Sequence, residues 1–372
     1  MASSDQTRRD LYQEVTNRIV AALEAGAPPW RRPWNPDIAA PTGPLNAVSG
    51  HRYRGINVLL LGSHPLAWET GDPRFCSYKQ AADKGWQVRK GEKASTVLFF
   101  KRLEVPTDSK ASTDDEDATK TVAMLRSYPV FHASQIDGIP PYVPPTTEEA
   151  PWRRPEAADI ILKNSGVSVR TGGDRAFYSP STDHVQLPPD AAFSNREAWA
   201  TTALHELGHA TGHPSRLDRD LRNRFGSAAY AMEELRAELA SAFMAAELGI
   251  PSELSGHASY VESWLSVLKQ DKREILRAAA DAQRIADWCL ARHPDYRLSA
   301  PEAAEKKSES GPMKPEPTAI AANAVPKPQS TGFRPLGEAM PEHLKRRLGI
   351  AAPEPVTQAA VPDAAPAYTQ AP

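Results

Sequence analysis

The pattern of hydrophobic and polar positions is clearest between Ser194 and Gly212. Apolar residues recur there at the spacing of one helix face: Trp199, Ala203, Leu204, Leu207 and Ala210. Just upstream, Ser194 and Glu197 have the Ser-x-x-Glu form of a capping box. Downstream, Gly212 followed by Pro214 is a helix stop signal. The pattern therefore predicts a buried helix of ordinary length over this stretch.

Helical periodicity predicts further helices on both sides of this stretch. Residues 227–249 form a second amphipathic pattern, whose core side consists of Leu235, Leu239, Ala242, Phe243 and Ala246. Residues 10–25 show the same spacing, and Gly26 ends that pattern. Other helices are expected over residues 77–85, 157–165 and 278–291, and in a segment that begins after Pro251.

Short runs rich in β-branched and aromatic residues predict strands between the helices. The expected strands are residues 96–100, 127–131, 167–169, 176–179 and 184–187. The last strand precedes the helix predicted between Ser194 and Gly212, and a strand so placed could bind an extended peptide by edge addition. This mixture of helices and strands predicts an α+β fold.

Composition divides the chain into four parts. Residues 140–155 are rich in proline, which is typical of a linker. We therefore expect two α+β domains over residues 8–140 and 156–295, a linker over 141–155, and a disordered Pro/Ala-rich tail over 300–372. Within the first domain, the acidic, Ser- and Thr-rich stretch of about residues 106–121 is expected to be a disordered insertion.

Length and overall charge constrain the function only weakly. A chain of 372 residues can bury a core in each of two domains, and a net charge of −2 indicates no class of partner. Cys76 and Cys289 are far apart and match no metal or disulfide framework, which favours a reducing compartment. The N-terminus is polar, and no window approaches a membrane span. We therefore expect a cytoplasmic protein that does not interact with membranes.

Residues 205–209 read His-Glu-x-x-His, the signature of zinc metalloproteases. Helix positions i and i+4 are neighbours, so His205 and His209 can converge on one ion at about 2.0–2.1 Å. Glu206 lies about 100° around the helix from His205, beside the ion but not on it. A carboxylate there can act as the general base for a water whose pKa the ion lowers towards about 7. The motif predicts Zn²⁺ as the cofactor, and other divalent metals are compatible with it.

The second amphipathic helix is expected to supply a third ligand. Glu234 and Glu238 lie one turn apart beside its core face, which suits a ligand carboxylate followed by a carboxylate that orients a histidine. We assign Glu234 as the ligand and Glu238 as the orienting group. Glu233 stays an alternative, as does His213, which would need a break at Gly212 because eight residues of helix span about 12 Å. Both carboxylates could instead be solvated helix charges.

His257 and Tyr260 are candidates for a role beside the metal. They are three residues apart in the helix expected after Pro251, so they share a face. Either side chain could stabilise an oxyanion. A core histidine and a packed tyrosine are equally compatible with this spacing.

Charge is unevenly distributed along the chain. Between Arg8 and Arg102 there are fifteen Lys or Arg residues against eight Asp or Glu residues, and aromatic residues lie among them. Basic groups neutralise phosphates and rings stack on any base, so this combination suits single-stranded DNA bound without sequence preference. The candidate DNA-binding residues are Trp30, Arg31, Arg32, Trp34, Arg52, Tyr53, Arg54, Arg89, Lys90 and Lys93. The alternative is a solvated basic face over an aromatic core.

Taken together, these motifs resemble the ArdC-type antirestriction proteins of conjugative plasmids over about residues 10–291. The matching segments are residues 26–34, 49–57, 88–93, 178–184 and 205–217. The resemblance implies an N-terminal domain that binds single-stranded DNA, a zincin-like metallopeptidase domain, and protection of incoming plasmid DNA from restriction enzymes. It identifies no peptidase substrate, for which a component of a restriction system is one candidate. The acidic insertion and the long tail depart from the family pattern without touching these segments.

We therefore expect an antirestriction protein that binds single-stranded DNA and carries a zinc-dependent peptidase-like site with Glu206 as general base. The alternative is a protein that coats single-stranded DNA and whose metal site is structural or vestigial. A nuclease is disfavoured, because the sequence has one metal motif and no carboxylate cluster of the two-metal type.

Overall fold

The computed structural model describes residues 9–30, 43–106, 119–144, 154–221, 227–251 and 258–296. The core of the acidic insertion, most of the proline-rich linker and the expected tail lie outside the described residues. None of the helices in the described ranges is long and apolar enough to cross a membrane.

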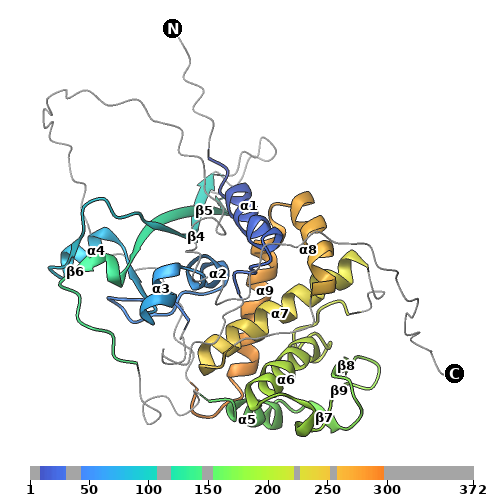
Figure 1. Ribbon diagram of the computed structural model, residues 1–372. Helices are drawn as coiled ribbons and strands as arrows, with labels where there is room; N and C mark the ends of the chain where they lie inside the picture. Colours follow the sequence, from blue (N-terminus) through green and yellow to red (C-terminus); the bar gives the residue numbers. More distant parts are fainter. Residues whose placement is uncertain are drawn as a thin grey trace, which may run out of the picture.

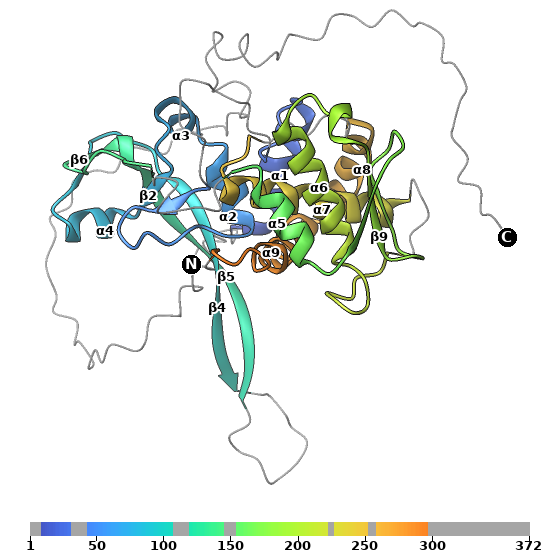
Figure 2. The same ribbon diagram turned by 90° about the horizontal axis from the view of Figure 1, so that it is seen from below.

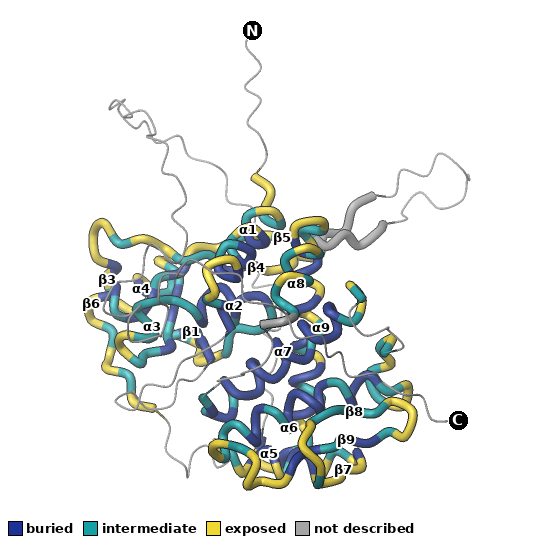
Figure 3. The backbone as a smooth tube through the Cα atoms, turned by 45° about the vertical axis from the view of Figure 1, so that its right-hand side comes forward, coloured by how far each residue is buried: buried dark blue, intermediate teal, exposed yellow. Residues whose placement is uncertain are grey.

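Four helices form the centre of the C-terminal half (Figure 1). They are α6 (Arg196–Ala210), α7 (Ala228–Leu248), α8 (Ala258–Gln270) and α9 (Glu274–Leu290). Helix α7 packs against the other three and is buried along almost its whole length (Figure 3). Ser227 caps its start, and Gly249, with φ of 67°, ends it in a left-handed conformation that glycine adopts readily. These boundaries confirm the helix predicted over residues 227–249.

Helix α6 also agrees with the prediction, except at its first turn. Its N-cap is Asn195, whose side chain accepts a hydrogen bond from the Ala198 N–H at 2.7 Å. The predicted capping box of Ser194 and Glu197 was therefore wrong by one residue. Asparagine is as good an N-cap as serine, so the local sequence offered two equivalent start sites.

A small sheet and one helix flank α6. The helix is α5 (Ala157–Asn164), and the sheet has the order β7 (Ser168–Thr171), β9 (His184–Leu187), β8 (Phe177–Ser179), followed by the 3-10 turn η2 (Asp190–Ala192). Strand β9 pairs parallel with β7 and antiparallel with β8. The expectation that residues 184–187 form a sheet edge was therefore wrong: β9 is central, and the edge strand that contacts α6 is β8.

The N-terminal half contains α1 (Leu11–Glu24) and three short helices, α2 (Ile56–Gly62), α3 (Pro65–Thr70) and α4 (Tyr78–Asp83). A four-stranded sheet has the order β1 (Leu45–Asn46), β2 (Arg74–Cys76), β5 (Thr119–His132), β4 (Ser95–Pro106). A second ribbon pairs β3 (Gln87–Val88) with β6 (Ile136–Asp137), which follows the 3-10 turn η1 (Ala133–Gln135).

Strands β4 and β5 form a long hairpin that extends away from the rest of the molecule (Figure 2). Pairing runs from Ser95↔Val130 to Pro106↔Thr119, so the strands predicted over residues 96–100 and 127–131 are only its base. The insertion expected over residues 106–121 is correspondingly shorter, because residue 106 and residues 119–121 belong to the strands.

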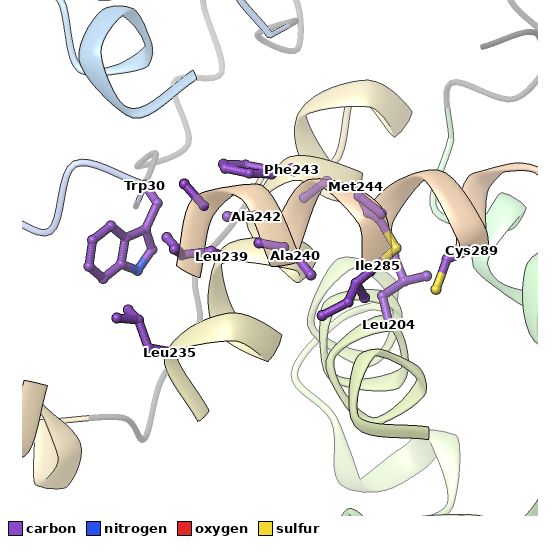
Figure 4. Packing of buried hydrophobic residues seen from close by; sticks show 14 of the residues in the cluster. Trp30, Leu204, Leu235, Leu239, Ala240, Ala242, Phe243, Met244, Ile285 and Cys289 are labelled. Atoms are coloured by element: carbon purple, nitrogen blue, oxygen red, sulfur yellow. The ribbon is translucent and has the colours of Figure 1, made fainter. Parts of the chain in front are cut away.

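The two halves of the chain share one hydrophobic core. Helix α1 packs on α8, and α2 contacts α9. Trp30, which follows α1, is only 4% exposed and lies beside Leu235 and Leu239 of α7 (Figure 4). Polar contacts also join the halves: the Thr16 hydroxyl donates to the Lys272 carbonyl, and the Gly55 N–H donates to Gln283, both at 2.8 Å. The two domains predicted from composition are therefore packed against each other through a common core.

Candidate metal centre

Helices α6 and α7 lie close together where α6 carries the His-Glu-x-x-His motif. Gly208 faces α7, and a Cβ atom added to it would lie 3.7 Å from the Ala237 Cα. The Ser241 hydroxyl donates to the Thr201 carbonyl at 3.0 Å within this interface. Small residues at a crossing let two helix backbones approach, and the longer side chains on either side then converge.

His205, His209 and Glu234 converge in this way and form one group of possible metal ligands, which we call the metal group. The two Nε2 atoms are 3.1 Å apart, and each lies 3.5 Å from one oxygen of the Glu234 carboxylate. The rings stand nearly perpendicular, with centroids 4.8 Å apart. Glu234, rather than Glu233 or His213, is the carboxylate or imidazole that completes this group.

The geometry of this group fits a divalent ion. Bonds of about 2.0–2.1 Å in a tetrahedral site place ligand atoms roughly 3.4 Å from one another, close to the distances between these three side chains. Two imidazoles and one carboxylate are also the protein ligands of one class of catalytic zinc site, which leaves a coordination position for a substrate or water. The same nitrogen and oxygen donors accept other divalent ions, so the ligand set alone does not select zinc.

Glu233 supports the site from the other side of His209. Its carboxylate lies 3.3 Å from the His209 Nδ1 and accepts two hydrogen bonds from the Arg219 guanidinium, at 2.7 and 3.1 Å. Burial opposes a charge on His209, but the carboxylates of Glu233 and Glu234 outweigh burial and raise the His209 pKa well above its ordinary value. Glu233 thus holds the Nδ1 side of the ring and leaves Nε2 directed at the metal group.

Glu238 lies one turn beyond Glu234 and is 1% exposed. One of its oxygens is 4.0 Å from the His205 Nδ1, and the other accepts a hydrogen bond from the Trp30 indole N–H at 3.2 Å. The carboxylate predicted to orient a histidine therefore lies beside His205, at a longer distance than the contact between Glu233 and His209. Trp30 brings the N-terminal half of the chain to the outer side of the metal group.

Glu206 lies beside the metal group in a buried position. Burial raises the pKa of its carboxyl, while His205 and His209 act in the opposite direction. The backbone N–H of Tyr178 in the edge strand β8 donates to this carboxylate. The proposed base is therefore held between α6 and the edge of the small sheet.

Two tyrosines lie on the far side of Glu234. Tyr230 is one turn before Glu234 on α7, and its hydroxyl is 3.5 Å from the Tyr260 hydroxyl. Burial and the Glu234 charge raise the pKa of Tyr230 far above its ordinary value, so it stays a proton donor. Tyr260 contacts Tyr230 through this pair of hydroxyls, and its ring also stacks on Trp264. His257 lies outside the described residues.

His213 belongs to a different cluster. Its Nδ1 bonds the Ser215 hydroxyl at 2.8 Å, and its Nε2 is 4.0 Å from Asp183. Asp183, with φ of 46°, forms an ion pair with Arg216 and accepts the Tyr178 hydroxyl at 2.8 Å. These contacts join the turn after β8 to the loop after α6, so they support the strand that contacts Glu206.

Several of the predicted DNA-binding residues are buried or paired. The burial of Trp30 corrects the prediction for that residue, because an enclosed ring cannot stack on a base. Arg52 forms an ion pair with Glu247 of α7 at 2.8 Å, and Arg54 forms one with Asp287 of α9. Tyr53 packs against the cluster of Leu61, Phe75, Val97 and Val130. These three residues join the halves of the chain or fill its interior, which leaves little of them to meet DNA.

The other predicted DNA-binding residues are exposed or undescribed. Arg89 is exposed but engaged, because it pairs with Glu92 and Asp137 and donates to the Ser134 carbonyl. Lys90 and Lys93 are exposed in the turn that leads to β4. Arg31, Arg32 and Trp34 lie outside the described residues.

Sequence reasoning missed two residues of the metal centre. Tyr230 could have been found, because it precedes Glu234 by four residues on the same predicted helix and therefore shares its face. Arg219 could not, since it lies in the loop after α6, where no periodicity indicates which way a side chain points. Its guanidinium nevertheless connects Glu233 to the Gly208 carbonyl and the Thr211 hydroxyl, at 2.8 and 2.7 Å.

Comparison with known families divides the chain at the same place as its composition. Residues 9–131 match the family described as the N-terminal domain of the anti-restriction factor ArdC, and residues 156–281 match the zincin-like metallopeptidases. The chain is 38% identical to the antirestriction ArdC protein of plasmid R388, whose crystal structure covers 78% of this chain and is itself covered completely. The TM-score is 0.64 against the metal-free form and 0.61 against the Mn(II)-bound form.

Three curated relatives also align with both halves of the chain. A DNA primase TraC of Escherichia coli is 44% identical over 298 residues, but the chain spans only 27% of that protein's length, and 20% of a second TraC. The protein y4eC of Sinorhizobium fredii is 43% identical over 295 residues and is covered to 94%. This full-length similarity, together with the R388 structure and the two family matches, shows that the chain belongs to the ArdC antirestriction family, with a zincin-like metallopeptidase half.

Proposed function

We propose that this chain protects incoming plasmid DNA from restriction by binding single-stranded DNA without sequence preference and by carrying a zinc-dependent peptidase-like site. The observation that carries the peptidase half is the convergence of His205, His209 and Glu234 beside the buried carboxylate of Glu206. The DNA-binding half is supported by the basic N-terminal region in a chain of the ArdC family.

In this proposal His205, His209 and Glu234 hold the metal. A divalent ion bound there supplies Lewis-acid chemistry, which activates water and polarises a carbonyl. Zinc is proposed from the His-Glu-x-x-His motif, and manganese is the alternative, since the related R388 protein has an Mn(II)-bound structure. Glu233 and Glu238 face the Nδ1 sides of the two rings, so each imidazole keeps its Nε2 for the ion.

Glu206 is the proposed general base. A base works best when its pKa lies near the working pH, and burial moves the pKa of this carboxyl upward in that direction. It accepts the proton of the attacking water and returns it to the leaving amine. The Tyr178 N–H orients the carboxylate for this transfer.

The edge strand β8 and the tyrosines suit a peptide substrate. Within the described ranges strand β8 pairs only with β9, so an extended peptide could add to its other edge next to Glu206. Tyr230 interacts with Glu234, and its hydroxyl contacts that of Tyr260, so we assign oxyanion stabilisation to this pair. His257 stays a candidate for the same role from the sequence. A protein of a restriction system is the proposed substrate class.

The role of the site is tested with Glu206→Gln. General-base catalysis contributes about 10²–10⁴-fold, so this variant should cleave a fluorogenic peptide library at least about 100-fold more slowly than the native chain. Its metal content should be unchanged, because Glu206 is not among the ligands. Native-like cleavage by Glu206→Gln would refute its role as base.

Plasmid transfer into a restricting host tests whether the site matters for protection. If proteolysis is needed, cells that carry Glu206→Gln should lose protection to the same extent as cells that carry His205→Ala. Full protection by both variants, with single-stranded DNA still bound in vitro, would identify a DNA-coating protein whose metal site is not catalytic. If the native chain does not bind single-stranded DNA in vitro, the DNA-binding part of the proposal is refuted.

A further inference from the structure

The β4–β5 hairpin has two faces with different surroundings. In an antiparallel pair, residues directly opposite each other lie on the same face of the ribbon, and successive residues alternate. Phe99 is opposite Arg126, Val97 is opposite Tyr128, and Lys101 is opposite Met124, so these six residues share one face. Leu98, Ser127, Phe100 and Leu125 share the other face.

The second face is the one that attaches the hairpin to the core. Leu98 is 4% exposed, and Leu125 packs against the main hydrophobic cluster. The Asn57 side chain of α2 bonds both the N–H and the carbonyl of Leu98, at 2.7 and 2.8 Å. These contacts fix the direction in which the first face points.

Among the side chains that the structure describes, the first face is covered at its base and exposed farther along. Val97 is 1% exposed under Leu61 and Phe75, but Phe99 and Tyr128 are 38% and 45% exposed. Their rings meet edge to face, with centroids 5.7 Å apart. Lys101 and Arg126 are also exposed, and neither forms an ion pair within the described ranges. We call Phe99, Lys101, Arg126 and Tyr128 the hairpin face.

We propose that the hairpin face is the surface on which single-stranded DNA binds. Two exposed rings next to two free cations supply both parts of such a site, since rings stack on unpaired bases and cations neutralise the flanking phosphates. The proposal rests on the proposed function and moves its DNA site away from Trp30, Arg52 and Arg54, which the fold buries or pairs.

The chemistry of the hairpin face favours this ligand over a second protein surface. A dimer interface of an exposed strand pair is typically apolar at its centre and depleted of charge, whereas here the rings alternate with cations. In a duplex the bases are paired and stacked on one another, so their faces are not available to stack on Phe99 and Tyr128. Lys90 and Lys93 lie in the turn that leads into β4, and they extend the positive charge toward the base of the hairpin.

The test compares two variants of the full chain by fluorescence anisotropy with a labelled oligothymidine. Phe99→Ala with Tyr128→Ala removes both rings of the hairpin face, and we expect affinity to fall at least about tenfold for each ring. The matched control is Phe100→Ala, which removes an aromatic side chain that is 55% exposed on the opposite face. The control should bind like the native chain.

The cations are tested through the salt dependence of binding. For single strands, each neutralised phosphate contributes about −0.7 to the slope of log affinity against log salt concentration. Lys101→Ala with Arg126→Ala should therefore make the slope shallower by about 1.4. An unchanged slope would overturn the assignment of these two side chains as phosphate contacts.

A cross-linking experiment on the unmutated chain is independent of folding in the variants. Oligothymidine carrying 5-iododeoxyuridine is irradiated in the complex, and the modified peptides are identified by mass spectrometry. Adducts on Phe99 or Tyr128 support the proposal, and adducts confined to other residues overturn it. If the native chain and the variant with Phe99→Ala and Tyr128→Ala bind the oligonucleotide equally well, the chain binds DNA but not through the hairpin face. If the native chain does not bind, the proposed function itself fails.

Discussion

Each half of the chain contains a pair of stacked or crossed histidines, and the two pairs have opposite electrostatics. In the C-terminal half, His205 and His209 face the carboxylates of Glu233 and Glu234, which raise the pKa of His209. In the N-terminal half, His64 and His132 stack with ring centroids 5.7 Å apart. Burial, together with the neighbouring histidine, lowers the pKa of His64 to about 4.

The difference shows what turns two histidines into a metal site. The His132 ring donates to the Asp72 carbonyl at 2.7 Å and accepts from the Ser134 N–H at 3.1 Å, so both of its nitrogens serve the fold. The His205 and His209 rings direct their Nε2 atoms at each other and at a carboxylate. The carboxylates that raise the pKa of His209 also favour a metal ion. A metal cation can replace the proton and interact with the same carboxylates.

The largest expected effect is on metal binding. His205→Ala removes one of three ligands, and we expect the affinity for Zn²⁺ to fall by more than about 100-fold, beyond the 10–100-fold typical of losing an outer partner. Metal content after dialysis, measured by mass spectrometry, should drop from one ion per chain to none.

His213→Ala is the matched control for this loss. His213 lies eight residues along the same chain segment but bonds Ser215 instead of the metal group. The His213→Ala variant should retain the ion. Folded protein with His132→Ala should retain it as well. Retention of metal by His205→Ala would abolish the contrast between the two histidine pairs.

Arg219→Ala should cause the largest loss of stability. It leaves the buried Glu233 carboxylate without its arginine partner and the end of α6 without two hydrogen bonds. Breaking a buried pair in this way typically costs about 3–5 kcal/mol, and we expect urea denaturation to show a loss in that range. Arg284→Ala, which breaks an ion pair of an arginine that is 72% exposed, should change the free energy of unfolding by less than about 1 kcal/mol.

The His64 pair should make the N-terminal half sensitive to acid. The pKa of His64 is about 4 in the fold against 6.5 in the unfolded chain, so the unfolded chain takes up a proton first as the pH falls. The free energy of unfolding is therefore highest above pH 6.5, where His64 is neutral in both states. It falls progressively down to about pH 4, by an amount on the order of 3 kcal/mol.

His64→Asn provides the comparison for this pH dependence. Asparagine can still accept the Leu66 N–H that the His64 side chain accepts as the N-cap of α3. The free energy of unfolding of the variant should therefore vary less between pH 6.5 and 4 than that of the native chain. An identical pH profile would show that His64 does not titrate in this window.

The smallest expected effect comes from Trp30, which joins the N-terminal half to the metal centre. Trp30→Phe keeps a ring in the core but removes the N–H that bonds Glu238, so we expect Zn²⁺ affinity to fall about tenfold. The free energy of unfolding should fall by about 1–3 kcal/mol, because a buried carboxylate loses a donor. Trp68→Phe removes an indole bond to the Gly62 carbonyl at 2.8 Å and should leave metal affinity unchanged. Equal affinities for both variants would mean that the N-terminal half does not position the metal ligands.

The metal centre was largely predictable because its information is local. His205, Glu206 and His209 lie within one turn and a half of one helix, and their relative positions follow from helix geometry alone. Glu234 was reached by the same periodicity on a second helix, although sequence could not decide between it and Glu233. That choice depends on the rotation of α7 against α6, which the contact of Gly208 with Ala237 fixes.

The proposed DNA-binding surface could not be predicted in the same way. Composition shows that Trp30, Arg52 and Arg54 lie in a basic, aromatic region, but it does not show what they face. Their partners, Glu238, Glu247 and Asp287, are more than 190 residues away in sequence. Phe99 and Tyr128 are exposed because their register in the hairpin puts them on its open face, and register is a property of two strands together.

The shared core has a consequence for how such chains recombine. A gene fragment that encoded only the zincin-like half would produce a protein whose α8 lacks the cover of α1 and whose Glu238 lacks the Trp30 indole. Selection would therefore disfavour crossovers at the boundary between the two family matches and favour exchange of the entire block. In the much longer TraC primases the similar stretch runs over 298 and 297 residues, the size of block that such inheritance would carry into a larger gene.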